Sequence, residues 1–87
     1  MGGGRATVRL FGPARTAFGR AVAEAPAGTV AEVVAALLAG ASNDQRAVVA
    51  TCGRWVNGAP AGDETPVADG DELALLPPVS GGCGSRR

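Results

Sequence analysis

Histidine and lysine are both absent from this chain of 87 residues, and cysteine occurs only twice. Without histidine, neither a serine–histidine nor a cysteine–histidine catalytic pair can be assembled, and zinc sites with an imidazole ligand are excluded. Cys52 and Cys83 are too few for a disulfide framework and too far apart in sequence for a Cys-x-x-Cys redox pair. We therefore expect a cytoplasmic protein, kept in a reducing compartment.

Long apolar runs and an excess of charge of either sign are lacking as well. The longest uninterrupted apolar run, residues 33–39, has seven residues, whereas a membrane span needs about 20. Eight arginines balance eight acidic residues, so no basic patch indicates nucleic acid or an anionic membrane as a partner. We expect neither kind of partner.

Large apolar side chains are also scarce. Alanine accounts for 18 residues, and valine, leucine and phenylalanine together account for another 18. This is near the roughly 20% limit below which chains are disordered, but disorder usually also needs high net charge, which is zero here. We expect one small domain over residues 5–78, after a disordered leader of residues 1–4 and before a flexible C-terminal tail of residues 79–87.

The apolar pattern of the first half predicts two strands and the main helix. Residues 5–11 alternate between two faces, and residues 20–25 form a weaker second strand beyond a loop over residues 12–19. Thr29 and Glu32 have the spacing of a helix-capping box. The residues that follow recur at the spacing of one helix face: Val30, Val33, Val34, Leu37 and Leu38.

The second half predicts two more strands. Residues 41–50 could hold a short helical turn, and residues 52–56 form a strand that ends at the tight turn Asn57-Gly58. Residues 72–76 form the last strand, which ends because prolines follow it. This order favours an α+β protein with a β-grasp layout, in which a mixed sheet of four to five strands has one main helix packed on one face.

The end of the chain carries the most specific motif. Residues 68–82 read Ala-Asp-Gly-Asp-Glu-Leu-Ala-Leu-Leu-Pro-Pro-Val-Ser-Gly-Gly. The Asp-Gly-Asp-Glu, the short apolar strand, the Pro-Pro-Val and the Gly-Gly resemble the C-terminal end of MoaD/ThiS-type sulfur carriers, and above all the small subunit of molybdopterin synthase. Residues 8–11 with Arg15, and residues 56–58, resemble earlier parts of that family, so the resemblance covers nearly the whole chain to Gly82.

The resemblance implies a ubiquitin-like carrier subunit that is not an enzyme by itself. An E1-like adenylyltransferase would use ATP to activate the carboxylate of Gly82, which follows Gly81, and a sulfurtransferase-type partner would convert it to a thiocarboxylate. A large synthase subunit or another sulfur-accepting enzyme would then receive the sulfur. The carrier would hold no permanent cofactor and no metal, and the absence of histidine agrees with chemistry at a main-chain carboxylate.

The tail has features that suit insertion into a partner. Residues 79–82 span about 13 Å when extended at roughly 3.3 Å per residue, and the two glycines lack a Cβ that would obstruct a narrow channel. The expected partner-binding residues are Pro77, Pro78, Val79, Ser80, Phe11 and Trp55. The prolines restrict the base of the tail, and aromatic side chains are enriched in interfaces. For Trp55, filling one end of the small core is an equal alternative.

The sequence departs from the family at its end, because residues 83–87 follow the Gly-Gly. Gly82 therefore has no free carboxylate as written, and we expect a processing protease to remove these five residues. Alternatively, Cys83 is a reactive thiol that takes the Gly82 acyl group as a thioester. Cys52, in contrast, is expected to be a buried structural thiol.

Two other functions stay open. The same chemistry could serve cysteine, thiamin or natural-product biosynthesis instead of molybdenum cofactor biosynthesis. The protein could also be a ubiquitin-like modifier, although without lysine it could not form lysine-linked chains. The acidic residues are interpreted as turn and surface residues and not as a metal site: Asp63, Glu64, Asp69, Asp71 and Glu72.

Overall fold

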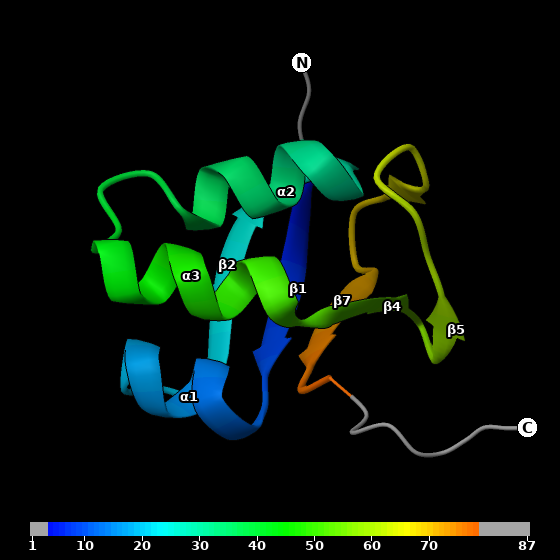
Figure 1. Ribbon diagram of the computed structural model, residues 1–87. Coiled ribbons are helices and arrows are strands. Elements are labelled where there is room, and N and C mark those ends of the chain that lie inside the picture. The colour runs from blue at the N-terminus through cyan, green and yellow to red at the C-terminus, as the bar shows by residue number, and fades with distance from the viewer. Residues whose placement is uncertain (1–3, 79–87) are drawn as a thin grey trace, which may run out of the picture.

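Five strands form one mixed sheet in the computed structural model of the chain, which describes residues 4–78. The sheet order is β2-β1-β7-β4-β5, and the helices lie against one of its faces (Figure 1). The strands are β1 (Arg5–Leu10), β2 (Val22–Pro26), β3 (Gly28–Thr29), β4 (Gly53–Val56), β5 (Ala59–Pro60), β6 (Pro66–Val67) and β7 (Glu72–Leu76). The helices are α1 (Gly12–Phe18), α2 (Val30–Leu37) and α3 (Asn43–Thr51).

The first and last strands lie side by side in the middle of the sheet. β1 and β7 are parallel, with Val8 opposite Leu73 and Leu10 opposite Leu75. All four side chains are buried, because alternate residues of each strand face the helices. β2 pairs antiparallel with β1, and β4 pairs antiparallel with β7. The predicted alternation in residues 5–11 and the predicted mixed sheet are therefore confirmed.

Helix α2 begins at the predicted capping box. The Thr29 hydroxyl accepts from the N–H of Glu32 at 3.2 Å, and the Glu32 carboxylate accepts from the N–H of Thr29 at 2.9 Å. Three valines of the predicted apolar face are buried: Val30, Val33 and Val34. The other two members, Leu37 and Leu38, are only half-buried, because the helix ends at Leu37 and the chain turns away at Gly40 with φ +76°.

Two further helices accompany α2, so the expectation of a single main helix was incomplete. Residues 12–18 form α1 where a loop was predicted, because Pro13 lies in the first turn, where a missing N–H costs no hydrogen bond. Residues 43–51 form α3, a full helix where only a helical turn was considered. Ser42 and Gln45 cap α3 in the same reciprocal way as Thr29 and Glu32 cap α2.

The segment between β5 and β7, interpreted as a loop, contains one short strand. β6 pairs antiparallel with β3 as a separate two-stranded ribbon, in which Gly28 lies opposite Val67. Val67 is buried, and the N–H of Val30 donates to the carbonyl of Thr65 at 2.9 Å. This ribbon fixes the start of α2 over the sheet.

Candidate functional site

The base of the C-terminal tail is set by the contact between β7 and the start of α1. The N–H of Phe11 donates to the carbonyl of Leu75 at 3.3 Å, which continues the β1–β7 pairing by one residue. The chain then turns at Gly12, whose φ is +54°, and a Cβ at Gly12 would lie 3.3 Å from Cγ of Pro77. Pro77 therefore fits against a position where glycine leaves space, and this contact directs the chain as it leaves the sheet.

Pro77 and Pro78 are exposed, and their predicted contact with a partner stays a prediction. The predictions for Val79, Ser80, Gly81, Gly82 and Cys83 fall outside the described residues 4–78, and so does the expected mobility of the tail. They stay predictions.

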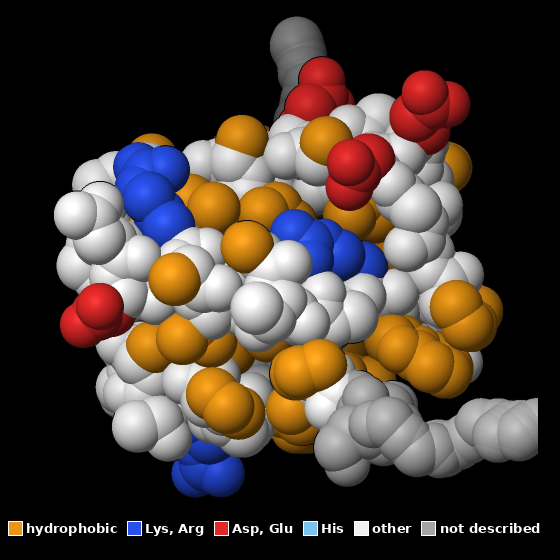
Figure 2. Space-filling view, viewed as in Figure 1, with side chains coloured by type: hydrophobic (Ala, Val, Ile, Leu, Met, Phe, Trp, Pro, Cys, Tyr) orange, Lys and Arg blue, Asp and Glu red, His pale blue; other side chains and the backbone are white. Residues whose placement is uncertain are grey.

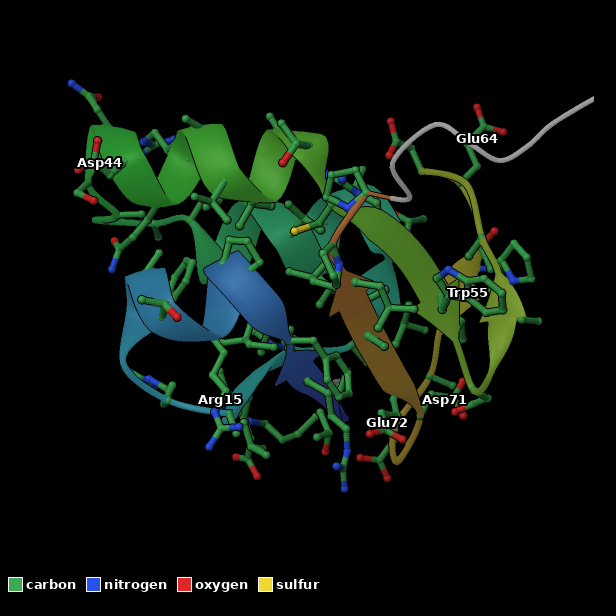
Figure 3. All side chains as sticks on the ribbon, turned by 60° about the horizontal axis from the view of Figure 1, so that its bottom comes forward. Arg15, Asp44, Trp55, Glu64, Asp71 and Glu72 are labelled. Carbon is green, nitrogen blue, oxygen red and sulfur yellow. The ribbon has the colours of Figure 1, made fainter. Side chains whose placement is uncertain are left out.

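A shallow hollow of about 310 Å³ lies on the open face of the sheet, beside the start of the tail. Its lining comes from β1 and the residue that follows it, from β4, from β7 and from the β4–β5 turn: Arg9, Phe11, Trp55, Asn57, Gly58, Glu72, Ala74 and Leu76. Trp55 is half-buried and Phe11 is 38% exposed. Figure 3 shows Trp55 and Glu72 on their strands, both pointing away from α3. The structure thus brings the two predicted interface aromatics, Phe11 and Trp55, into one surface.

The hollow carries one ion pair across its floor. Arg9 of β1 pairs with Glu72 of β7, and both side chains are partly exposed to solvent. From the sequence, Glu72 was interpreted only as a turn or surface residue, and Arg9 was not assigned to a site. In the sequence, their position is indicated only by the alternation of side chains between the two faces of a strand. Once the β1–β7 register is known, this alternation puts Arg9 and Glu72 on the face opposite Leu73 and Leu75.

The Asn57-Gly58 turn is tied to the first residue of β7. Asn57 has a positive φ of 50° and its Oδ1 accepts from the N–H of Glu72 at 3.0 Å, while its own N–H donates to the carbonyl of Glu72 at 2.9 Å. These two bonds hold the turn against the start of β7, at the border of the hollow. The predicted turn at Asn57-Gly58 is confirmed. Hydrogen bonds from the Ala68 N–H and the Asn57 side chain lower the pKa of Asp71, so this carboxylate stays ionised to lower pH than a free aspartate would.

Cys52 is buried, as predicted, with 5% of its surface exposed. Its Sγ donates to the carbonyl of Val48 at 3.3 Å. Burial raises the pKa of the Cys52 thiol, and the nearby charge of Arg54 offsets this only in part. The thiol is therefore protonated at neutral pH and is a poor nucleophile.

The acidic turn before β7 has its carboxylates engaged with the backbone. Asp69 accepts from the N–H of Arg5 and Asp71 accepts from the N–H of Ala68, each at 2.9 Å. Within residues 4–78, no group of three or more acidic or cysteine side chains is placed to hold a metal ion. No helix in the same part of the chain is long and apolar enough to cross a membrane.

The chain is similar to a known protein family and to several solved structures. The model of the ThiS family matches residues 8–82. The crystal structure of small archaeal modifier protein 1 from Haloferax volcanii is 30% identical, with 91% of this chain and 100% of that chain covered and a TM-score of 0.76.

Two further similar structures are complexes. One is the BexX/CysO complex of Amycolatopsis orientalis, with 28% identity, 88% of this chain and 99% of that chain covered, and a TM-score of 0.71. The other is the complex of subunits 1 and 2 of molybdopterin-converting factor from Helicobacter pylori, with 28% identity, coverage of 93% and 99%, and a TM-score of 0.65. These likenesses confirm the ubiquitin-like β-grasp fold. Comparison with curated protein sequences gave no match.

Proposed function

The chain belongs to the ThiS family, and from this premise we propose that it carries sulfur as a thiocarboxylate at Gly82, most directly as the small subunit of a molybdopterin synthase. Proteins of this family are small carriers and not enzymes in themselves. The observation that carries the proposal is the family match, which extends to Gly82 and stops five residues before the end of the chain.

The proposed chemistry needs a free carboxylate at Gly82, made by removal of residues 83–87. That carboxylate attacks the α-phosphorus of ATP on an E1-like adenylyltransferase, and pyrophosphate leaves. A persulfide sulfur from a sulfurtransferase-type partner then displaces AMP, and a second thiol cleaves the acyl disulfide to leave the thiocarboxylate. The protein's own part is to present its end, which explains why no histidine or other side-chain catalyst is required.

The hollow next to the tail supports docking of these partners. Phe11, Trp55 and Leu76 line this one hollow, next to the point where the chain leaves the sheet. A partner that covers this surface would hold the tail in a fixed direction, because Pro77 packs against Gly12. The two similar structures solved as complexes, with BexX and with subunit 2 of molybdopterin-converting factor, support the same role for a protein partner.

Conjugation to other proteins is the second candidate, supported by the 30% identity to small archaeal modifier protein 1. It uses the same activated Gly82, but the acceptor is a lysine of a target protein instead of sulfur. The two functions differ in their products. Transfer to targets produces an amide-linked adduct of higher mass, whereas sulfur carriage increases the mass of the trimmed chain by about 16 Da, which is the difference between oxygen and sulfur.

The test is ATP–pyrophosphate exchange with the adenylyltransferase of the same organism. A chain that ends at Gly82 should support exchange, and the 87-residue chain should not, because an amide at Gly82 has no ionised oxygen to attack phosphorus. Gly82→Ala in the trimmed chain should reduce exchange strongly and leave the unfolding midpoint unchanged. Equal exchange by both lengths, with no cleavage visible by mass, would overturn the trimming step and favour Cys83 as the reactive group.

A further inference from the structure

A groove lies on the helical side of the molecule, between α2 and the segment that runs from α3 into β4. Its volume is about 410 Å³. Its apolar wall comes from α2, and two arginines stand at its border: Ala31, Val34, Ala35, Leu38, Arg46 and Arg54. Figure 2 shows the same arrangement, in which two separate blue groups flank orange side chains on this face. The hollow beside the tail is on the opposite side of the sheet.

Both arginines are held in place by helix ends. Arg46 donates from Nη2 to the carbonyl of Leu38, the residue that caps α2, at 3.0 Å. Arg54 donates from Nη1 to the carbonyls of Val49 and Cys52, at the end of α3, at 3.0 and 2.6 Å. Positive charge is favourable at helix C-termini, so these bonds hold each guanidinium group near one position.

Neither arginine pairs with a carboxylate among residues 4–78. The ion pairs of this part of the chain are Arg5 with Glu24 and Arg9 with Glu72. A guanidinium group has five N–H donors, and Arg46 and Arg54 each use only one nitrogen. The Nε of Arg54 is buried and has no acceptor within the same residues. Buried donors almost always have a partner, so the Nε of Arg54 is a donor that a ligand atom or a water molecule in the groove would satisfy.

We propose that this groove binds an acidic, amphipathic segment of a partner protein. Apolar side chains of the segment would lie along α2, against Val34 and Leu38, and its carboxylates would reach the guanidinium groups of Arg46 and Arg54. Asp63 borders the groove as well and repels a carboxylate there, so the acidic positions of the ligand lie at the arginines. The tail of the same chain does not fit this chemistry, because residues 83–87 contain two arginines and no acid.

The consequence is a carrier that can hold two partners at once. The groove is on the helical side and the hollow is on the open side of the sheet, so neither surface covers the other. An enzyme that docks on the helical groove could remain attached while successive partners act on the tail. This inference does not depend on the identity of the group carried at Gly82.

The probe is a helical peptide with blocked termini, in which leucines recur every three to four residues on one face and glutamates flank them. It is titrated into the ¹⁵N-labelled 87-residue chain. We expect saturable amide shifts for Val34, Leu38 and Arg46, with half-saturation below about 1 mM, and no shift of the Trp55 indole. The matched control peptide has glutamine in place of every glutamate and should bind about tenfold more weakly at low salt. Added salt should remove most of this difference.

Substitution of single arginines tests which positive charge contributes to binding of the acidic peptide. Arg46→Gln, on an exposed side chain, should weaken binding of the acidic peptide about threefold or more. Arg15→Gln removes the same charge from an exposed side chain of α1, which contributes no residue to the groove, and should leave binding unchanged. Equal binding of the two peptides, an equal effect of the two variants, or shifts centred on Trp55 would overturn the proposal. Concentration-dependent shifts of the groove without peptide would also overturn it, since a second copy of the chain would then be the occupant.

Discussion

Gly12 combines a backbone angle that disfavours a side chain with a close neighbour. Its φ of +54° is left-handed, and a Cβ would meet Pro77 at 3.3 Å. Gly19 is a matched control, because its φ is +70° and a Cβ there would meet nothing within 4 Å. Comparing alanine at the two positions therefore separates backbone strain from the contact with the base of the tail.

We expect Gly12→Ala and Gly19→Ala each to lower the free energy of unfolding by about 1–2 kcal/mol from backbone strain, and Gly12→Ala to lower it further because its Cβ meets Pro77. Only Gly12→Ala should also reduce ATP–pyrophosphate exchange by the chain ending at Gly82, because it displaces Pro77 and redirects the tail. Urea unfolding measures the first effect and the exchange assay measures the second. If both variants lose exchange to the same extent, the contact with Pro77 does not direct the tail.

Burial of Cys52 predicts how the free energy of unfolding depends on pH. Its folded-state pKa is raised by burial, so the folded state keeps its proton at a pH where the unfolded state has lost it. The contribution of Cys52 to the free energy of unfolding is constant below the pKa that the thiol has in the unfolded chain. Above that pH the free energy of unfolding falls, until the pH reaches the pKa of the thiol in the folded chain. Cys52→Ala should remove this slope between neutral and alkaline pH in urea unfolding.

The same burial should protect the thiol from alkylation. Iodoacetamide at neutral pH should leave Cys52 unmodified in the native chain and modify it in denaturant, as read from the mass of the peptide that contains it. Modification in the native chain at the rate of a free thiol would show that the site opens frequently.

At the scale of elements, α2 depends on its first turn. Thr29→Ala should lower the free energy of unfolding by about 1 kcal/mol, since the N–H of Glu32 loses its acceptor. Thr29→Ser keeps a hydroxyl and should cost much less. Thr29 also belongs to β3, opposite Pro66. If serine costs as much as alanine in urea unfolding, the loss comes from the β3–β6 ribbon and not from the helix cap.

The elements also show what could be predicted from the sequence. The period of two in β1 and the capping box of α2 are local signals, and both were read correctly. α1 was not predicted because residues 12–19, which include Pro13, were interpreted as a loop, although proline also suits the first turn of a helix. The Ser42–Gln45 pair carried the same signal as Thr29–Glu32 and was overlooked because few apolar residues follow it.

The hollow could not be predicted in the same way. Its residues come from β1, β4 and β7, and their meeting depends on the register between strands that are far apart in sequence. Phe11 and Trp55 were selected as aromatic residues only. That they share a surface with the Arg9–Glu72 pair follows from the sheet order and not from any local pattern.

At the scale of the whole molecule, the two large apolar side chains that are exposed among residues 4–78 lie at different places. Phe11, 38% exposed, borders the hollow, and Val22, 46% exposed, lies on the edge strand β2. Phe11→Ser should raise the KM of the adenylyltransferase for the trimmed chain by about tenfold, because aromatic side chains often carry much of the binding energy of an interface. Val22→Ser should leave KM unchanged. Equal KM values for the two variants would exclude the hollow as the docking surface.

The pairing of β1 with β7 at the centre of the sheet also determines when the protein can fold during synthesis. The ribosome makes β1 and β2 first and β4 and β5 later, but these two strand pairs share no edge until β7 lies between them. Any nascent or truncated chain that stops before Glu72 exposes two unpaired strand edges and is prone to aggregate. The strand that leads to Gly82 is thus the one that completes the sheet, so an incomplete chain has neither a stable fold nor a reactive end to offer a partner.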